Sequence, residues 1–211
     1  MIAERLNHVI QRIQKVDHSQ KVKLIAVSKK KSIALIKEAI NSGQKDFGEN
    51  YLQEAVEKIK AIDDPSLTWH FIGPIQSNKT ASIAKYFQWV HSVDRKKVLT
   101  RLNEQSKENQ KVLNVLIQVN IDDEDTKSGV MPEEIDDLVN YANELSNISL
   151  KGFMCIPQPG NSEESFKKMK ILLNSYPYLE TLSMGMSNDL EIAIRNGSTM
   201  VRIGTDIFGA R

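Results

Sequence analysis

The sequence predicts a single (β/α)8 barrel, the TIM-barrel fold, with an extra helix at its N-terminus. Apolar runs of strand length alternate with helical stretches along the chain, which is typical of a parallel sheet covered on both faces. About eight such units occur, the number that closes a barrel. The 211 residues suit one domain, 1–211, at the short end of this fold's range. An open doubly wound sheet is the alternative, but it often has a glycine-rich first turn, and residues 28–31 contain no glycine.

The opening helix is predicted over residues 1–16, where apolar side chains recur at helical spacing. The expected strands are Lys23–Ser28, Asp46–Phe47, Thr68–Ile72, Trp89–Ser92, Val112–Ile121, Ser149–Met154, Glu180–Ser183 and Met200–Ile203. The expected helices between them are Ile33–Asn41, Tyr51–Ile62, Lys79–Phe87, Lys96–Glu108, Pro132–Leu145, Ser162–Ser175 and Asp189–Asn196. Pro132 and Ser162 suit helix starts, and Gly43 and Gly197 suit helix ends. Every strand except the last is thus expected to precede a helix.

Composition excludes several classes of protein. Lysine and arginine total 28 against 27 acidic residues, which argues against a nucleic-acid binder driven by net charge. No apolar run approaches the roughly 20 residues of a membrane helix, and charge appears at once in residues 1–6, unlike a signal peptide. Cys155 is the one cysteine, so no intrachain disulfide can form. We therefore expect a cytoplasmic protein without nucleic-acid or membrane partners.

Lys29 is the first candidate functional residue. It follows the apolar run 24–27, and active sites of such barrels lie at the carboxyl ends of the strands. If the strand continues, Ile25, Val27 and Lys29 share one face, so Lys29 faces the barrel interior if Val27 does. A desolvated amine has a lowered pKa and can condense with an aldehyde. The alternative is a solvated run of three lysines, 29–31, that caps the strand.

Arg202 and two nearby loops form the second group of candidates. Arg202 lies within an apolar strand, where it needs a partner: an acid on a neighbouring strand, or the ring nitrogen or phosphate of a ligand. Residues 185–187 and 204–205 follow the last two strands, where barrels commonly bind phosphate. Ser187 also suits the N-cap of the helix near Asp189. The alternative is ordinary capping and turn chemistry.

Two further signals are weaker. Asn50 suits a cap for the helix that starts at Tyr51, and His70 suits a hydrogen-bonded core histidine. The four histidines, His8, His18, His70 and His91, show no metal-ligand spacing, so no metal site is expected.

Five sequence blocks resemble one known family, the pyridoxal phosphate homeostasis proteins. The blocks are Ala26–Lys29, Phe47–Asn50, Trp69–Lys79, Leu182–Asp189 and Val201–Gly209. They occur in the family's order and span essentially the whole chain. That family is similar in fold to the N-terminal barrel of alanine racemase, which agrees with the strand count.

The resemblance implies a set of cofactor contacts. Lys29 would form a Schiff base with pyridoxal 5′-phosphate (PLP), and Arg202 would face the pyridine nitrogen. The other contacts implied are three phosphate ligands, a methionine lining their loop and two residues flanking the ring: Ser187, Gly204, Thr205, Met186, Asn50 and Met154.

The implied arginine also bears on the function. A guanidinium is always charged, so it disfavours protonation of the pyridine nitrogen and makes the ring a poor electron sink. The chain is too short for the second domain from which racemases take a second base. We therefore expect a monomeric protein that holds PLP for intracellular homeostasis without robust catalysis, with apo PLP-dependent enzymes as recipients. The alternatives are an amino-acid racemase-type PLP enzyme and a barrel enzyme that uses Lys29 as an aldolase-type amine on a phosphorylated metabolite.

Overall fold

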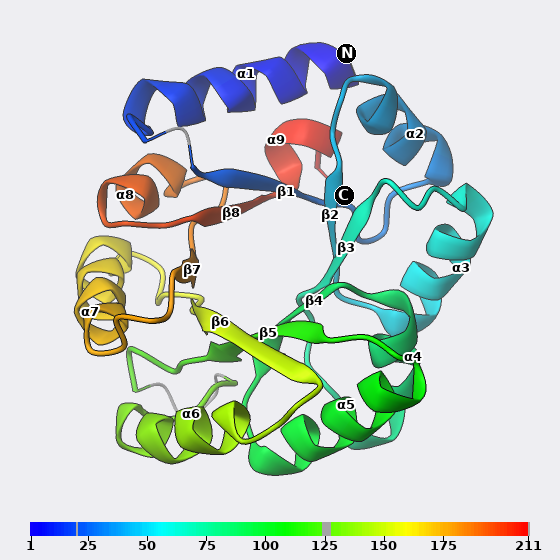
Figure 1. Cartoon of the computed structure of the whole chain (residues 1–211). Helices are drawn as coiled ribbons and strands as arrows, with labels where there is room; N and C mark the ends of the chain where they lie inside the picture. Colours follow the sequence, from blue (N-terminus) through cyan, green and yellow to red (C-terminus); the bar gives the residue numbers. More distant parts are fainter. Residues whose placement is uncertain (20, 124–127, 211) are drawn as a thin grey trace.

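A computed structural model describes residues 1–19, 21–123 and 128–210. Eight parallel strands form a closed barrel in the order β1 to β8, with β8 beside β1 (Figure 1). The strands are β1 Lys23–Val27, β2 Asp46–Glu49, β3 Thr68–Phe71, β4 Trp89–Val93, β5 Leu113–Gln118, β6 Ile148–Met154, β7 Thr181–Ser183 and β8 Met200–Ile203. The predicted (β/α)8 barrel is confirmed.

Helices cover the outside of the barrel (Figure 1). They are α1 Ile2–Val16, α2 Ile33–Asn41, α3 Leu52–Ile62, α4 Thr80–Tyr86, α5 Lys96–Glu108, α6 Ile135–Asn143, α7 Ser162–Asn174, α8 Leu190–Arg195 and α9 Thr205–Phe208. Short 3-10 turns at Ser77–Lys79 and Pro132–Glu134 lead into α4 and α6. Gly43 and Gly197 follow α2 and α8 with positive φ angles, as expected of helix ends.

The prediction that no helix follows the last strand is wrong, because α9 follows β8. One helical turn is too short to show a periodic pattern, yet its Ile207 and Phe208 side chains are buried. The second strand also extends to Glu49, two residues beyond the prediction, because Gly48 and Glu49 pair with β3. The fifth strand is shorter than predicted and ends at Gln118.

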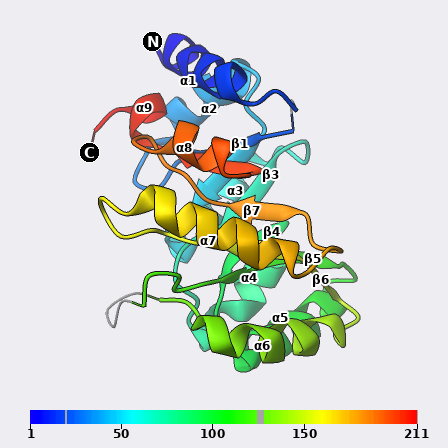
Figure 2. The same cartoon turned by 90° about the vertical axis from the view of Figure 1, so that its left-hand side faces the viewer.

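The predicted extra helix, α1, lies outside the barrel against α2, α8 and α9 (Figure 2). Its Arg12 side chain binds Glu191 of α8 at 2.7 Å and Asp206 of α9 at 2.6 Å. Arg12 also donates to the Ser187 carbonyl at 2.9 Å. The helix therefore braces the two segments that follow β7 and β8. Within the described residues, no helix is both long and apolar enough to cross a membrane.

Candidate functional site

A tight turn carries Lys29. The Lys31 amide donates to the Ser28 carbonyl at 3.1 Å, and Lys30 has a φ of 59°. Val27 shares its face of β1 with Ile25, because a β-carbon on Gly48 would meet both side chains, and Ile25 pairs in register with the buried Arg202. Strand β1 ends at Val27, however, so the turn and not the strand pleat places the half-buried Lys29. The expected continuation of the strand through Ser28 is one residue too long.

A buried ion pair under α3 supports this turn. The Lys58 ammonium donates to the Ser28 carbonyl and to Glu49 Oε1, both at 2.7 Å, and also binds Glu54. The Ser28 hydroxyl donates to the same Glu49 oxygen at 2.6 Å, and the Lys30 amide donates to Glu54. Burial raises the pKa of Glu49 above its ordinary value, although hydrogen bonds from Lys58 and Ser28 oppose the rise. Sequence reasoning missed this cluster entirely.

Arg202 is buried in β8, beside β1. It pairs in register with Ile25 of β1, so the turn that carries Lys29 follows the strand that neighbours Arg202. Its Nη1 donates to Ser183 Oγ at 2.7 Å and its Nη2 to the Cys155 carbonyl at 2.9 Å. Burial lowers the pKa of Arg202 below its ordinary value. Among the described residues no carboxylate forms a salt bridge with Arg202, so that interpretation is wrong.

The two expected phosphate loops lie after neighbouring strands, β7 and β8. Met186 is exposed, Ser187 is half-buried, and Gly204 and Thr205 follow β8. The prediction that Ser187 caps the next helix is wrong. The N-cap is Asp189, whose Oδ1 accepts the Met186 amide at 2.7 Å and so closes the loop.

Asn50 follows β2, and Met154 is the last residue of β6, at the same end of the barrel. Asn50 Oδ1 is buried and has no hydrogen-bond partner among the described residues. Helix α3 has Tyr51 as its N-cap, so the predicted capping role of Asn50 is wrong. Asn50 instead lines a cavity of about 250 Å³ together with Ile72, Asn120 and Ile156. An unpaired buried acceptor at a cavity wall fits a polar ligand, since such an atom otherwise carries a desolvation cost.

All eight predicted cofactor contacts come from consecutive strands of the closed barrel. Met154 ends β6, Met186 and Ser187 follow β7, and Arg202 to Thr205 belong to β8 and its loop. Lys29 follows β1 and Asn50 follows β2. Since β8 pairs with β1, these five strands form one uninterrupted arc whose carboxyl ends meet on one side.

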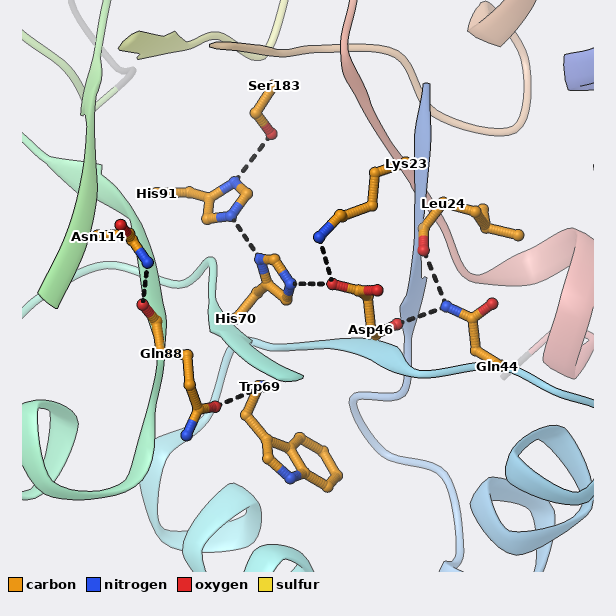
Figure 3. Close-up of polar contacts among 10 residues, drawn as sticks. All are labelled: Lys23, Leu24, Gln44, Asp46, Trp69, His70, Gln88, His91, Asn114 and Ser183. Atoms are coloured by element: carbon orange, nitrogen blue, oxygen red, sulfur yellow. Dashed lines mark hydrogen bonds and ion pairs between the residues drawn. The ribbon is translucent and has the colours of Figure 1, made fainter. Parts of the chain in front are cut away.

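A chain of polar side chains inside the barrel leads away from Ser183, the partner of Arg202 (Figure 3). Ser183 Oγ lies 2.9 Å from His91 Nδ1, and His91 Nε2 lies 2.9 Å from His70 Nδ1. His70 Nε2 lies 3.0 Å from Asp46 Oδ1, which also pairs with Lys23 at 3.2 Å. His70 is thus the hydrogen-bonded core histidine expected from the sequence, but its pairing with His91 was not foreseen.

Both buried histidines should make stability depend on pH. Burial lowers the pKa of His70, against the opposing effect of Asp46, and burial with the charges of His70 and Arg202 brings the pKa of His91 well below its ordinary value. The unfolded chain then binds protons below about pH 6.5 that the folded chain does not bind. We expect the free energy of unfolding to fall as the pH drops from 7.5 to 5.5, by up to about 1.4 kcal/mol per pH unit for each histidine.

Urea unfolding at several pH values measures this slope. His91→Gln should reduce it by about half, because one titrating group is removed. The matched substitution His8→Gln, on the exposed face of α1, should leave the slope unchanged. A stability that stays constant between pH 7.5 and 5.5 would contradict the prediction.

Comparison with known proteins gives this fold a family. The sequence model described as "Alanine racemase, N-terminal domain" matches residues 3–211. A "Pyridoxal phosphate homeostasis protein" of Pasteurella multocida (strain Pm70) is 47% identical over 222 residues, covering 100% of this chain and 94% of the relative. This chain belongs to the pyridoxal phosphate homeostasis protein family. The resemblance seen in the sequence is confirmed.

A second relative and two solved structures extend the comparison. The Escherichia coli (strain K12) protein of that name is 48% identical, covering 91% of this chain and 87% of the relative. The structure of PipY from Synechococcus elongatus PCC7942, with PLP bound, has a TM-score of 0.89 and 34% identity, covering 99% of this chain and 100% of PipY. Alanine racemase from Clostridium difficile 630 has a TM-score of 0.77 at 15% identity, covering 99% of this chain and 57% of that enzyme, which shows the shared fold alone.

Proposed function

We propose that this chain binds PLP at the carboxyl ends of its strands and holds it as a Schiff base on Lys29, in intracellular homeostasis of the cofactor. The observation that carries the proposal is that Lys29 lies in the turn after β1 while the buried Arg202 lies in β8, the strand paired with β1. The buried and unpaired Asn50 Oδ1 supports it, because it offers an acceptor to a polar ligand. Family membership supports it further, since the related PipY has been solved with PLP bound.

Arg202 has a defined part in this proposal. Ser183 and the Cys155 carbonyl hold its two terminal nitrogens, so the guanidinium is fixed before any ligand arrives. Facing the pyridine nitrogen, its permanent charge disfavours a proton there. PLP supplies an aldehyde and an electron-accepting ring, and the ring is a poor electron sink when its nitrogen is unprotonated. A fixed arginine therefore favours holding the cofactor over carbanion chemistry.

The remaining contacts divide between the phosphate and the ring. We assign the phosphate to the backbone and hydroxyl groups of Ser187, Gly204 and Thr205, with Met186 lining the loop. Asn50 and Met154 flank the ring from β2 and β6. The proposal also takes residues 1–211 as one PLP-binding domain that works in the cytoplasm as a monomer, with apo PLP-dependent enzymes as recipients.

Borohydride trapping tests the assignment. The full chain is incubated with PLP, its visible absorbance is recorded, and borohydride then reduces any Schiff base to a stable amine for peptide mass analysis. We expect the modification on Lys29 and its complete loss, with the absorbance, in Lys29→Ala. Lys30→Gly is the matched control: it removes the neighbouring amine, and glycine suits the φ of 59° at that position.

Two results would overturn parts of the proposal. An absorbance band that survives in Lys29→Ala, or a modification on another lysine, would contradict the Schiff-base assignment. Sustained racemisation of an amino acid by the pure protein, lost in Lys29→Ala, would instead favour the racemase-type enzyme.

A further inference from the structure

The polar chain behind Arg202 runs through the barrel to its opposite end. Arg202 comes from β8 and Ser183 from the neighbouring β7. The other members come from a second group of neighbouring strands: His91 from β4, His70 from β3 and Asp46 from β2 (Figure 3). The His70, His91 and Ser183 residues are fully buried, whereas the Asp46 side chain is 16% exposed and its partner Lys23 is 41% exposed. The chain therefore connects the candidate site to a carboxylate at the amino ends of the strands.

The hydrogen bonds along this chain can take only one direction when both histidines are neutral. Asp46 is ionised and can only accept, so His70 must carry its hydrogen on Nε2. His70 Nδ1 is then an acceptor, and His91 must donate to it from Nε2. His91 Nδ1 in turn accepts from the Ser183 hydroxyl, whose oxygen accepts from Arg202. Every hydrogen therefore points from the guanidinium toward the carboxylate.

Charges and packing hold the chain in this state. Burial raises the pKa of Asp46, but the hydrogen bond from His70, together with the charge of Lys23, brings it below its ordinary value, so the carboxylate stays ionised. The Trp89 ring stacks on His70 with centroids 5.8 Å apart and planes 18° apart. His91 meets His70 edge to face at 5.1 Å. Both imidazoles are thus held by rigid strands and aromatic contacts rather than by loops.

We propose that His70 and His91 are positioning residues that orient the Arg202 guanidinium through Ser183 and link it to Asp46 at the far end of the barrel. This inference rests on the proposed function, because it assigns Arg202 to a ligand. Removing the carboxylate removes the group that sets the direction of the chain. The Ser183 hydroxyl is then free to turn, and the Cys155 carbonyl is the remaining fixed acceptor that orients the guanidinium toward the ligand.

The first test needs no cofactor. Selective ¹⁵N labelling of histidine in the full chain reports the protonation of each imidazole nitrogen by NMR. The chain has four histidines, and the exposed pair is assigned from His8→Gln and His18→Gln. At pH 7 we expect His70 and His91 each to be neutral, with the hydrogen on Nε2. In Asp46→Asn, at least one of the two rings should become a mixture of tautomers. A buried histidine in the wild type that is charged, or that carries its hydrogen on Nδ1 alone, would overturn the proposed direction.

The second test asks whether the far end influences the ligand. Asp46→Asn should weaken PLP binding by about tenfold, the scale of one lost charge-assisted hydrogen bond, and should change the absorbance of the bound cofactor. Ser183→Ala removes the hydroxyl at the other end of the polar chain. It should also weaken PLP binding and change the absorbance of the bound cofactor. Asp137→Asn is the control, because that carboxylate is 73% exposed and lies outside the barrel interior.

The outcomes separate this inference from the proposed function. If the wild type fails to bind PLP, the proposed function fails. The NMR result still decides the direction of the hydrogen bonds between Ser183 and Asp46. If the wild type binds PLP but Asp46→Asn and Ser183→Ala keep its affinity and spectrum, the chain is only structural and the positioning role is refuted.

Discussion

Replacing Lys58 with methionine is expected to lower the free energy of unfolding by about 3–5 kcal/mol at pH 8, the usual effect of breaking a buried ion pair. The Lys58 and Glu49 side chains are only 6% and 0% exposed. Without the ammonium, Glu49 is left as a buried charge, and its Oε2 already has no partner among the described residues. The Ser28 carbonyl also loses a donor at 2.7 Å.

The penalty in Lys58→Met should depend on pH. Burial already raises the pKa of Glu49, and loss of the lysine raises it further. A carboxyl whose pKa is higher in the folded state favours folding at low pH, and that contribution disappears as the pH rises through the folded-state pKa. The variant should therefore be closer to the wild type at pH 5 than at pH 8. Urea unfolding monitored by circular dichroism at both pH values measures the difference.

A double substitution provides the control. Glu49→Met combined with Lys58→Met replaces the pair by apolar groups of similar length, which is often far less harmful than leaving one charge alone. We expect the double variant to be more stable than Lys58→Met at pH 8. A single variant within about 1 kcal/mol of the wild type, or a double variant less stable than the single one, would contradict this account.

The same cluster shows why part of the site escaped sequence reasoning. Lys58 lies in a helix rich in charged residues, where a lysine normally faces solvent. Its burial depends on Glu49, which lies two residues beyond the end of the predicted strand Asp46–Phe47. Only the pairing of β2 with β3 shows that Glu49 belongs to a strand. Local sequence patterns do not show how neighbouring strands pair.

The polar interior was hidden for a related reason. Alternation of strands and helices, and the carboxyl-end rule for barrels, were enough to predict the fold and to select Lys29, Arg202 and the two loops. The bond between His70 and His91 depends on how β3 pairs with β4, where His70 lies opposite Trp89, and the sequence does not show that register. Nothing in the sequence distinguishes Asp46 and Lys23 from ordinary charged residues at the ends of strands.

Replacing Gly152 with alanine is expected to destabilise the barrel by about 3 kcal/mol or more. Gly152 lies in β6 beside the register shift with β5 and pairs with Thr181 of β7. A β-carbon there would lie 2.0 Å from the Thr181 carbonyl oxygen, a backbone atom that cannot move without separating the two strands. The φ of 152° adds backbone strain for any residue with a side chain.

Gly43→Ala is the matched control, because Gly43 also has a positive φ but no atom within 4 Å of an added β-carbon. It should cost only the backbone strain, about 1–2 kcal/mol. Urea unfolding compares the two, and equal costs would show that the close approach at Gly152 is relieved by a small shift. The steric account also predicts a functional effect, since Met154 and the Cys155 carbonyl lie just beyond Gly152. Separating β6 from β7 moves that carbonyl away from Arg202, so any folded Gly152→Ala protein should bind PLP more weakly than Gly43→Ala.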